Sequence, residues 1–227
     1  MDAQPAAEDP DALYADRETP ASATRAVALW EARVAAAPAD IEAGWKLARG
    51  RYWLGTNGPG TSDEKKRMLE AGMAAARHVI TQAPARPEGH FWLAANMGAL
   101  AEAHGLRQGI RYRGGIKSAL ETVLRLDPGY LDGSADRALG RWYFKVPGLF
   151  GGSNRRSEEH LRKALAYNPD SVITRLFLAE TLVDLDRRDE ARRELEAAIA
   201  APLDPDWAPE DRVFKAQAAA LLTRLSR

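Results

Sequence analysis

Apolar and small residues recur at the same offsets in five segments of the chain, and each segment stops at a proline. Residues three or four positions apart lie on one face of a helix, so each segment has an apolar face to bury. The five triads are Ala26, Trp30 and Arg33 before Pro38; Gly72, Ala76 and Val79 before Pro84; Gly115, Ala119 and Val123 before Pro128; Ser157, Leu161 and Ala164 before Pro169; and Ala191, Leu195 and Ala198 before Pro202.

A second apolar run follows each of the first four prolines, so the repeating unit is a pair of helices. No stretch shows the alternation of a β-strand, and the chain is predicted to be all-α. The last predicted helix lacks the repeat offsets, which is typical of a capping helix. The predicted helices lie at about residues 21–37, 41–54, 62–82, 87–104, 110–126, 130–144, 154–167, 171–185, 188–200 and 208–226.

The offsets resemble those of the tetratricopeptide repeat, which closes on a proline at a period of about 34 residues. Pro169 and Pro202 are 33 residues apart, whereas the earlier prolines are 46, 44 and 41 residues apart. The additional residues of these longer repeats lie between the two helices of each pair, near residues 55–63, 104–115 and 145–154. They either enlarge three turns on one edge or lengthen the helices. The resemblance implies a tetratricopeptide-like α-solenoid of about four to five helix pairs plus a C-terminal capping helix.

The first ten residues are small, acidic and rich in proline, without the basic and apolar segments of a signal peptide. We therefore expect a disordered or extended tail over residues 1–20. Residues 21–227 are expected to form a single solenoid domain, because each repeat is stabilised by its neighbours. Such a tail suits a secreted protein whose leader was replaced by a methionine, and equally a cytosolic protein.

Composition narrows the classes of function. The 32 basic residues balance 32 acidic ones, so no overall field favours nucleic acid or an anionic membrane. The absence of cysteine excludes disulfides, thiolate metal sites and a cysteine nucleophile. No apolar run approaches the roughly 18–20 residues of a membrane span.

Catalytic and metal-binding motifs are missing. Residues 55–61 begin like a phosphate-binding loop but lack its lysine, and no strand precedes them. The four histidines, His78, His90, His104 and His160, show no metal-ligand spacing. We therefore predict no catalytic residue, metal or cofactor. An enzyme hypothesis would rest only on His90 and His104 facing one cleft.

In the tetratricopeptide frame, the first helix of each pair lines the concave groove. Its inward positions here are rich in aromatic residues, although the whole chain is only 7% aromatic. Such rings offer a ligand or a partner a large apolar area with a polar edge; alternatively, they pack between the helices. The predicted groove residues are Trp45, Arg49, Tyr52, Trp53, Phe91, Trp142 and Tyr143.

Cations gather near the second predicted turn, beside a glycine pair, Gly114 and Gly115, that is expected to open a helix. Because a helix N-terminus favours anions, this cluster could hold an anionic group of a solute or of a partner. The alternative is a solvated helix end. The predicted anion or partner contacts are Arg107, Arg111, Arg113 and Lys117.

Two stretches, GHFWLAANMG at residues 89–98 and GRWYFKVPGLFGGS at residues 140–153, resemble a bacterial family of tetratricopeptide proteins associated with TRAP transporters, the T component. The resemblance covers most of residues 20–225. It implies a periplasmic lipoprotein with an apolar pocket or pore that assembles with a periplasmic solute-binding protein. The cysteine that carries the lipid is absent from this chain. The pattern is more distantly similar to the eukaryotic regulators of microtubule dynamics.

Two functions from different classes follow. The first is a non-catalytic, transport-associated binding or adaptor protein, lipid-anchored in the periplasm. It would hold a small apolar or amphipathic solute, or a partner protein, in the aromatic groove. The alternative is a cytosolic scaffold that grips an extended peptide of a partner. Neither involves nucleic acid, both allow a homo-oligomer, and contact with a membrane is expected only through the lipid anchor.

Overall fold

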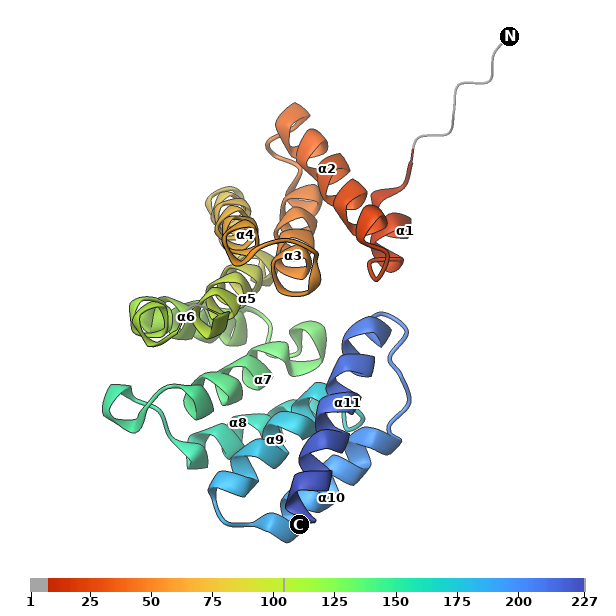
Figure 1. Ribbon diagram of the computed structural model, residues 1–227. Coiled ribbons are helices and arrows are strands. Elements are labelled where there is room, and N and C mark those ends of the chain that lie inside the picture. Colours follow the sequence, from red (N-terminus) through yellow and green to blue (C-terminus); the bar gives the residue numbers. More distant parts are fainter. Residues whose placement is uncertain (1–7, 104, 227) are drawn as a thin grey trace. The chain divides into compact units, whose positions relative to one another are not determined.

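The computed structural model of the chain describes residues 8–103 and 105–226, apart from the side chains of Leu106 and Arg107. The described residues form eleven α-helices and one short 3₁₀ helix, and none of them lies in a β-strand. This confirms the all-α prediction. The chain divides into two compact units, unit 1 (Met1–Ala103) and unit 2 (His104–Arg227), and Figure 1 shows the helices of each in chain order.

Unit 1 is a row of helices in which each packs against the next along the chain. Helix α3 contacts α2, α4 and α5, and therefore forms the centre of the unit. The buried rings of Tyr14 and Trp30 begin its core, with centroids 5.4 Å apart. The helices of unit 1 are α1 (Pro10–Ala15), α2 (Pro20–Ala36), α3 (Ile41–Asn57), α4 (Ser62–Gln82) and α5 (Pro87–Ala103).

Unit 2 is also built from paired helices. Helix α7 pairs with α8, and α9 with α10, while α11 packs against both α9 and α10. The last helix therefore takes the position that the first helix of another pair would have. The helices of unit 2 are α6 (Leu106–Leu126), α7 (Tyr130–Lys145), the 3₁₀ helix η1 (Gly148–Phe150), α8 (Asn154–Tyr167), α9 (Val172–Asp184), α10 (Arg188–Ala200) and α11 (Ala208–Leu225).

The repeated triads mark the core. The middle residue of every triad is buried, and two outer members, Arg33 and Gly115, are exposed. The offsets therefore identify where one helix meets its partner, which is why they repeat from pair to pair. The exposed fractions of the middle residues are 0% for Trp30, 0% for Ala76, 7% for Ala119, 0% for Leu161 and 0% for Leu195.

Helices α7 and α8 approach closely at a glycine. A Cβ added at Gly140 would lie 2.5 Å from Cγ of Leu161, much closer than nonbonded carbon atoms pack. Gly114 in α6 is different, because an added Cβ would have no atom within 4 Å there. Glycine is thus required by packing at the first position and not at the second.

The predicted tail over residues 1–20 contains a helix. Asp9 caps α1 by accepting the backbone N–H of Asp11 at 2.9 Å. Tyr14 of this helix is 6% exposed and packs on Trp30, which ties α1 to unit 1. The helix has only six residues, too few to show a helical period in the sequence. Residues 1–7 of the expected tail lie outside the described residues.

The three predicted enlarged turns have different outcomes. The additional residues near 104–115 lengthen a helix, since α6 begins at Leu106. The additional residues near 55–63 are divided between a longer α3 and a short turn. Only residues 146–153 form an enlarged turn, which contains η1 and passes through Gly151 at a φ of 102°.

Helix α7 begins with an unusual backbone. Leu131, Asp132 and Gly133 have φ values of 45°, 55° and 73°, so this first turn is left-handed. Left-handed backbone costs about 1–2 kcal/mol for each residue that carries a Cβ. A Cβ at Gly133 would lie 2.8 Å from Cδ2 of Tyr167, so the turn also depends on a close approach to α8.

The different packing at Gly140 and at Gly114 can be tested by changing each glycine to alanine. We expect Gly140→Ala to lower the free energy of unfolding by about 1–3 kcal/mol, because the new methyl group overpacks the contact with Leu161. The matched change Gly114→Ala should leave stability unchanged or raise it by about 0.5–1 kcal/mol, because alanine favours an exposed helix. Urea unfolding measures both, and equal effects would contradict the packing argument.

The cap of α3 predicts a dependence on pH. Asp40 accepts the backbone N–H of Ala43 at 2.9 Å and Nη2 of Arg33 at 2.8 Å. The bond from Ala43, helped by the Arg33 guanidinium, holds the pKa of Asp40 below its ordinary value of 3.8. An acid with a lowered pKa stabilises the fold above its ordinary pKa, and this contribution is lost as the pH falls through the folded pKa.

We expect Asp40→Ala to lower the free energy of unfolding by about 1 kcal/mol at neutral pH. The difference from the unsubstituted chain should shrink in acid, once Asp40 is protonated in both states. Asp40→Asn keeps the capping oxygen and should lose less than Asp40→Ala. Urea unfolding at neutral and acidic pH measures these differences, and equal losses for both variants would rule out the cap as their cause.

Candidate functional site

An open groove of about 480 Å³ lies between α9 and α11 of unit 2. Leu176 and Glu180 line it from α9, one helical turn apart. Residues of α11 line the other side at helical spacing, and Ala220 and Arg224 among them are exposed. The groove thus combines apolar, hydrogen-bonding and charged groups. The α11 lining consists of Gln217, Ala220, Leu221, Thr223 and Arg224.

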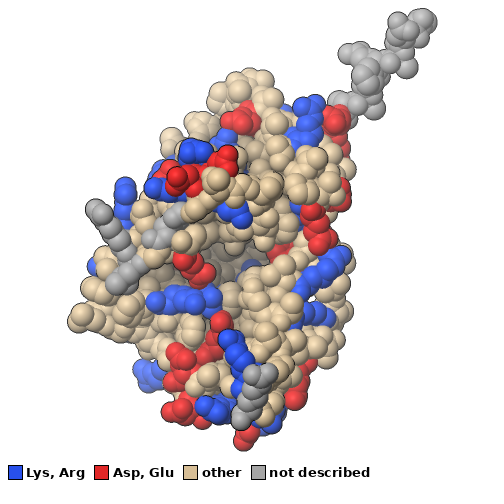
Figure 2. All heavy atoms as spheres, viewed as in Figure 1, with Lys and Arg blue, Asp and Glu red and all other residues tan. Residues whose placement is uncertain are grey.

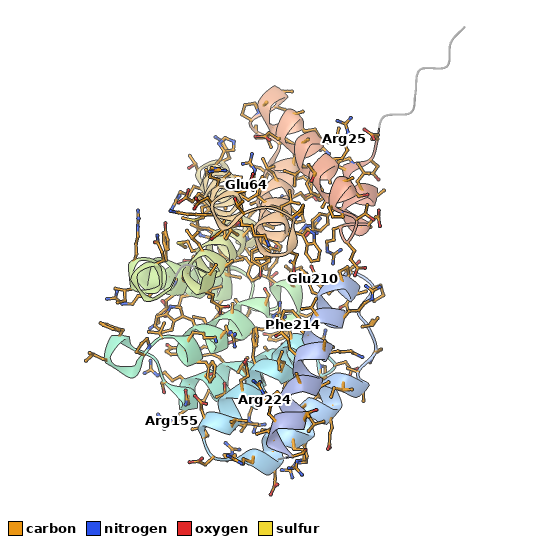
Figure 3. All side chains as sticks on the ribbon, in the orientation of Figure 1. Arg25, Glu64, Arg155, Glu210, Phe214 and Arg224 are labelled. Atoms are coloured by element: carbon orange, nitrogen blue, oxygen red, sulfur yellow. The ribbon has the colours of Figure 1, made fainter. Side chains whose placement is uncertain are left out.

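Aromatic packing holds the two helices of the groove together. Phe177 of α9 and Phe214 of α11 meet edge to face, with ring centroids 6.2 Å apart. The guanidinium carbon of Arg141 lies 4.3 Å from the centroid of Phe177. The apolar contact therefore positions both a cation from α7 and the lining of α11; Figure 3 labels Phe214 and Arg224 on that helix.

The charges of the groove differ in how they are held. Arg141 of α7 forms an ion pair with Glu180 at 2.5 Å, so the carboxylate on the α9 side is already paired. Arg224 has no ion pair with another side chain in the described part of the chain, and it is exposed. A ligand entering this groove would therefore meet an available cation on α11 and a neutralised acid on α9.

The sequence did not predict this groove. Its lining is not aromatic, and α11 was expected to serve only as a cap. The available signal was the amphipathic face of residues 209–225, whose exposed side repeats Gln217, Ala220 and Arg224 at helical spacing. That spacing alone does not reveal which helix lies opposite.

The seven predicted groove residues divide between the two units, and none of them lines the groove between α9 and α11. Four of their aromatic rings are buried, and these rings pack in the cores of the units instead of lining a groove. The exposed fractions are 6% for Trp53, 8% for Phe91, 8% for Trp142 and 5% for Tyr143.

The two buried tryptophans among these seven residues also satisfy their N–H groups internally. Nε1 of Trp53 donates to the carbonyl of Arg17 at 2.9 Å, and Nε1 of Trp142 donates to the carbonyl of Arg113 at 2.9 Å. Each indole thus ties its helix to a neighbouring segment. A buried ring with its polar atom satisfied is typical of a core residue.

The other predicted groove residues, Trp45, Arg49 and Tyr52, also make contacts within unit 1. The guanidinium carbon of Arg49 lies 4.2 Å from the ring centroid of Tyr14 and 5.0 Å from that of Trp45. Nε1 of Trp45 donates to Glu42 at 3.0 Å. Tyr52 is half-buried with its centroid 5.8 Å from that of Trp92. Arg49 therefore occupies the space between the rings that a cationic ligand would use.

The glycine pair of the predicted anion site is not at a helix N-terminus. Helix α6 begins at Leu106, so Gly114 and Gly115 lie inside it, and the expectation that they open a helix is wrong. A long amphipathic segment overrode the two glycines, whose cost in a helix is only about 1 kcal/mol each. Without the terminus, the free backbone N–H groups that would bind an anion are missing there.

The predicted basic residues lie in different surroundings along α6. Arg111 is exposed beside Tyr112, and Arg113 donates to the carbonyl of Ile110 at 2.7 Å. Lys117 pairs with Glu121 at 3.7 Å, and its Nζ lies 5.5 Å from the ring centroids of both Trp142 and Tyr143. The side chain of the fourth predicted residue, Arg107, lies outside the described residues.

A contact between a histidine and an aspartate, which the sequence did not predict, joins α7 to α8. Nδ1 of His160 lies 2.6 Å from Oδ1 of the buried Asp136. The ring of Tyr143 stacks on His160, with centroids 5.4 Å apart, and Nη1 of Arg156 donates to the Tyr143 hydroxyl at 3.3 Å. Asp136 and His160 are far apart in the sequence, so no motif marks them. The carboxylate orients the imidazole and connects the two helices.

The described residues provide no metal site and no membrane-spanning helix. On the face that Figure 2 shows, basic and acidic side chains are interspersed. Among residues 8–103 and 105–226, no group of three acidic or histidine side chains is placed to hold a metal ion. No described helix is long and apolar enough to cross a membrane.

Solved structures with the same fold include a tetratricopeptide protein. A thermophilic tetratricopeptide-repeat protein from Thermus thermophilus has 23% sequence identity and a TM-score of 0.69, over 94% of this chain and 97% of its own. Two structures of the protein MamA have 15% identity and TM-scores of 0.54 and 0.53, over 89% of this chain and 95% and 90% of theirs. The predicted tetratricopeptide-like fold is therefore confirmed.

Family models divide the chain near the turn between α7 and α8. A tetratricopeptide-repeat family matches residues 152–225. A separate comparison with curated protein sequences finds no match. The model of the family described as "Regulator of microtubule dynamics protein 1-3" matches residues 7–150, which is more than half of the chain. The chain belongs to the regulator of microtubule dynamics protein 1-3 family.

Proposed function

We propose that this chain is a non-catalytic adaptor that binds a short segment of a partner protein in the groove between α9 and α11. The groove itself is the observation that carries the proposal. Helical repeat proteins use the surfaces formed by successive helix pairs to bind partners. Here α11 supplies one wall in the position of the first helix of a further pair.

The lining of the groove suits a peptide. Ala220 and the half-buried Leu221 offer apolar contact for one anchoring side chain of the partner, above the buried Leu176. The Gln217 amide can donate hydrogen bonds to a peptide backbone and accept them from it, whereas the Thr223 hydroxyl, which donates to the carbonyl of Ala219, can accept one. Arg224 is available for an acidic side chain, whereas Glu180 is already paired with Arg141. The expected segment therefore carries an apolar residue followed or preceded by an acidic one.

An adaptor fits this lining better than an enzyme does. The groove contains no histidine, and its only acid is held in an ion pair. Catalysis requires a nucleophile or a general base within hydrogen-bond reach of a reacting group. The pair of His160 and Asp136 joins α7 to α8 and is not part of the groove lining.

The finer role suggested by the resemblance to transporter-associated proteins stays a prediction. It comprises a periplasmic location, a lipid anchor, an apolar solute and a periplasmic solute-binding partner. The family that matches the chain is the regulator of microtubule dynamics family, and the rings expected to hold a solute are largely buried. A peptide in the groove of unit 2 requires none of these features.

Peptide selection from a random display library tests the proposal. We expect selected peptides to bind the unsubstituted chain and to lose about tenfold or more in affinity with Ala220→Arg, which fills the groove. Fluorescence anisotropy with a labelled peptide measures the change. Arg224→Glu should reverse the preference for acidic peptides, because it replaces the available cation.

The neighbouring change Ala219→Arg is the matched control. Ala219 is also an exposed alanine of α11, but it does not line the groove. Affinity should therefore remain within about twofold of the original value. Equal losses for both variants, or binding that neither variant affects, would place the peptide elsewhere and contradict the proposal.

A further inference from the structure

The turn between α7 and α8 presents apolar side chains to solvent. Leu149 is 89% exposed, more than any other large apolar residue described, and the adjacent Phe150 is 37% exposed. The turn is closed at its base, where the N–H of Ser153 donates to the carbonyl of Tyr143 at 2.8 Å. Figure 1 shows the turn projecting beyond the end of α7. Burial in a core does not explain these two side chains.

Cations surround the base of this turn. Lys145 is the last residue of α7, and Arg155 and Arg156 lie in the first turn of α8. From α6, Arg113 reaches the turn, with its guanidinium carbon 5.5 Å from the ring centroid of Phe150. Arg155, labelled in Figure 3, has an 83% exposed side chain. Three helices thus supply cations near the base of the turn, and Arg113 is the one that contacts the ring of Phe150.

Little negative charge offsets this cluster. Arg155 lies 3.7 Å from Glu159 in an exposed pair, which contributes little in water. In the described part of the chain, Arg113, Lys145 and Arg156 form no ion pair with an acidic side chain. The balanced charge of the whole chain does not cancel the cluster, because interactions beyond about 8–10 Å are screened by salt.

We infer that this turn docks on an anionic lipid surface. A bilayer presents negative headgroups first and hydrocarbon behind them, and the turn has the complementary order, with Leu149 and Phe150 at the tip and cations behind. Each Lys or Arg near such a surface strengthens binding about fivefold. Two apolar side chains alone would hold a protein weakly, so both parts are needed. The inference is independent of the groove between α9 and α11.

Flotation of the full chain with lipid vesicles tests the inference. We expect binding to vesicles of phosphatidylcholine with about one third phosphatidylserine, weaker binding at high salt, and no binding to phosphatidylcholine alone. Leu149→Asp should abolish binding. Leu203→Asp is the matched control, because Leu203 is 41% exposed in another turn of unit 2. It should bind like the unsubstituted chain.

The cations have a matched control as well. Lys145→Glu with Arg155→Glu should weaken vesicle binding by about tenfold or more. Arg188→Glu with Arg193→Glu changes the net charge equally at exposed positions of α10 and should have little effect. Equal losses for the two double variants would mean that only net charge matters and would overturn the proposed site. Circular dichroism verifies that each variant is folded.

Insertion of the tip can be observed directly, because the chain contains no cysteine. A polarity-sensitive dye attached to Leu149→Cys should shift to shorter wavelength with anionic vesicles, whereas the same dye on Leu203→Cys should not. The inference is overturned if the chain does not bind anionic vesicles, if Leu149→Asp binds as before, or if the dye at position 149 does not shift. Binding to soluble heparin but not to vesicles would also overturn it and would assign the cluster to an acidic macromolecule.

Discussion

The need of each helix to bury one apolar face against the next is the constraint on which the rest of the structure depends. The distance between two packed helices depends on the smallest residue at their contact. Between α7 and α8 this residue is Gly140, which packs against Leu161. Where helices pack in this way, their opposite faces are left exposed at positions that the packing determines. Ala218 of α11 is buried, whereas Ala220, two residues further along the same helix, lies in the groove.

The sequence predicted the helices α2 to α11 to within a few residues. Trp30, Ala76 and their equivalents recur with a helical period, and a proline follows each of these runs. The prediction failed where a signal was short or was overridden. Helix α1 has too few residues to show a period, and the expectation that Gly114 and Gly115 open a helix gave these glycines too much weight.

The candidate site was harder to predict than the fold. Aromatic residues such as Trp142 can line a groove or fill a core, and both roles use the same positions of a helix. The distinction depends on which helix lies opposite, as the bond from Trp142 to the carbonyl of Arg113 shows. The groove between α9 and α11 depends in the same way on the packing of the last helix, which carries no repeat offsets. Local periodicity does not contain that information.

The dominance of contacts between helices that are neighbours along the chain has a kinetic consequence. The helix pairs that pack extensively within each unit are adjacent, or separated by a single helix, in the sequence. Loops between such contacts are short, so the entropy lost in closing them is small and folding is fast for the size of the chain. A stack held together by neighbours also opens locally. Amide hydrogens of α11, which contacts only α9 and α10 extensively in the described residues, would then exchange with solvent before those of the central helix α3.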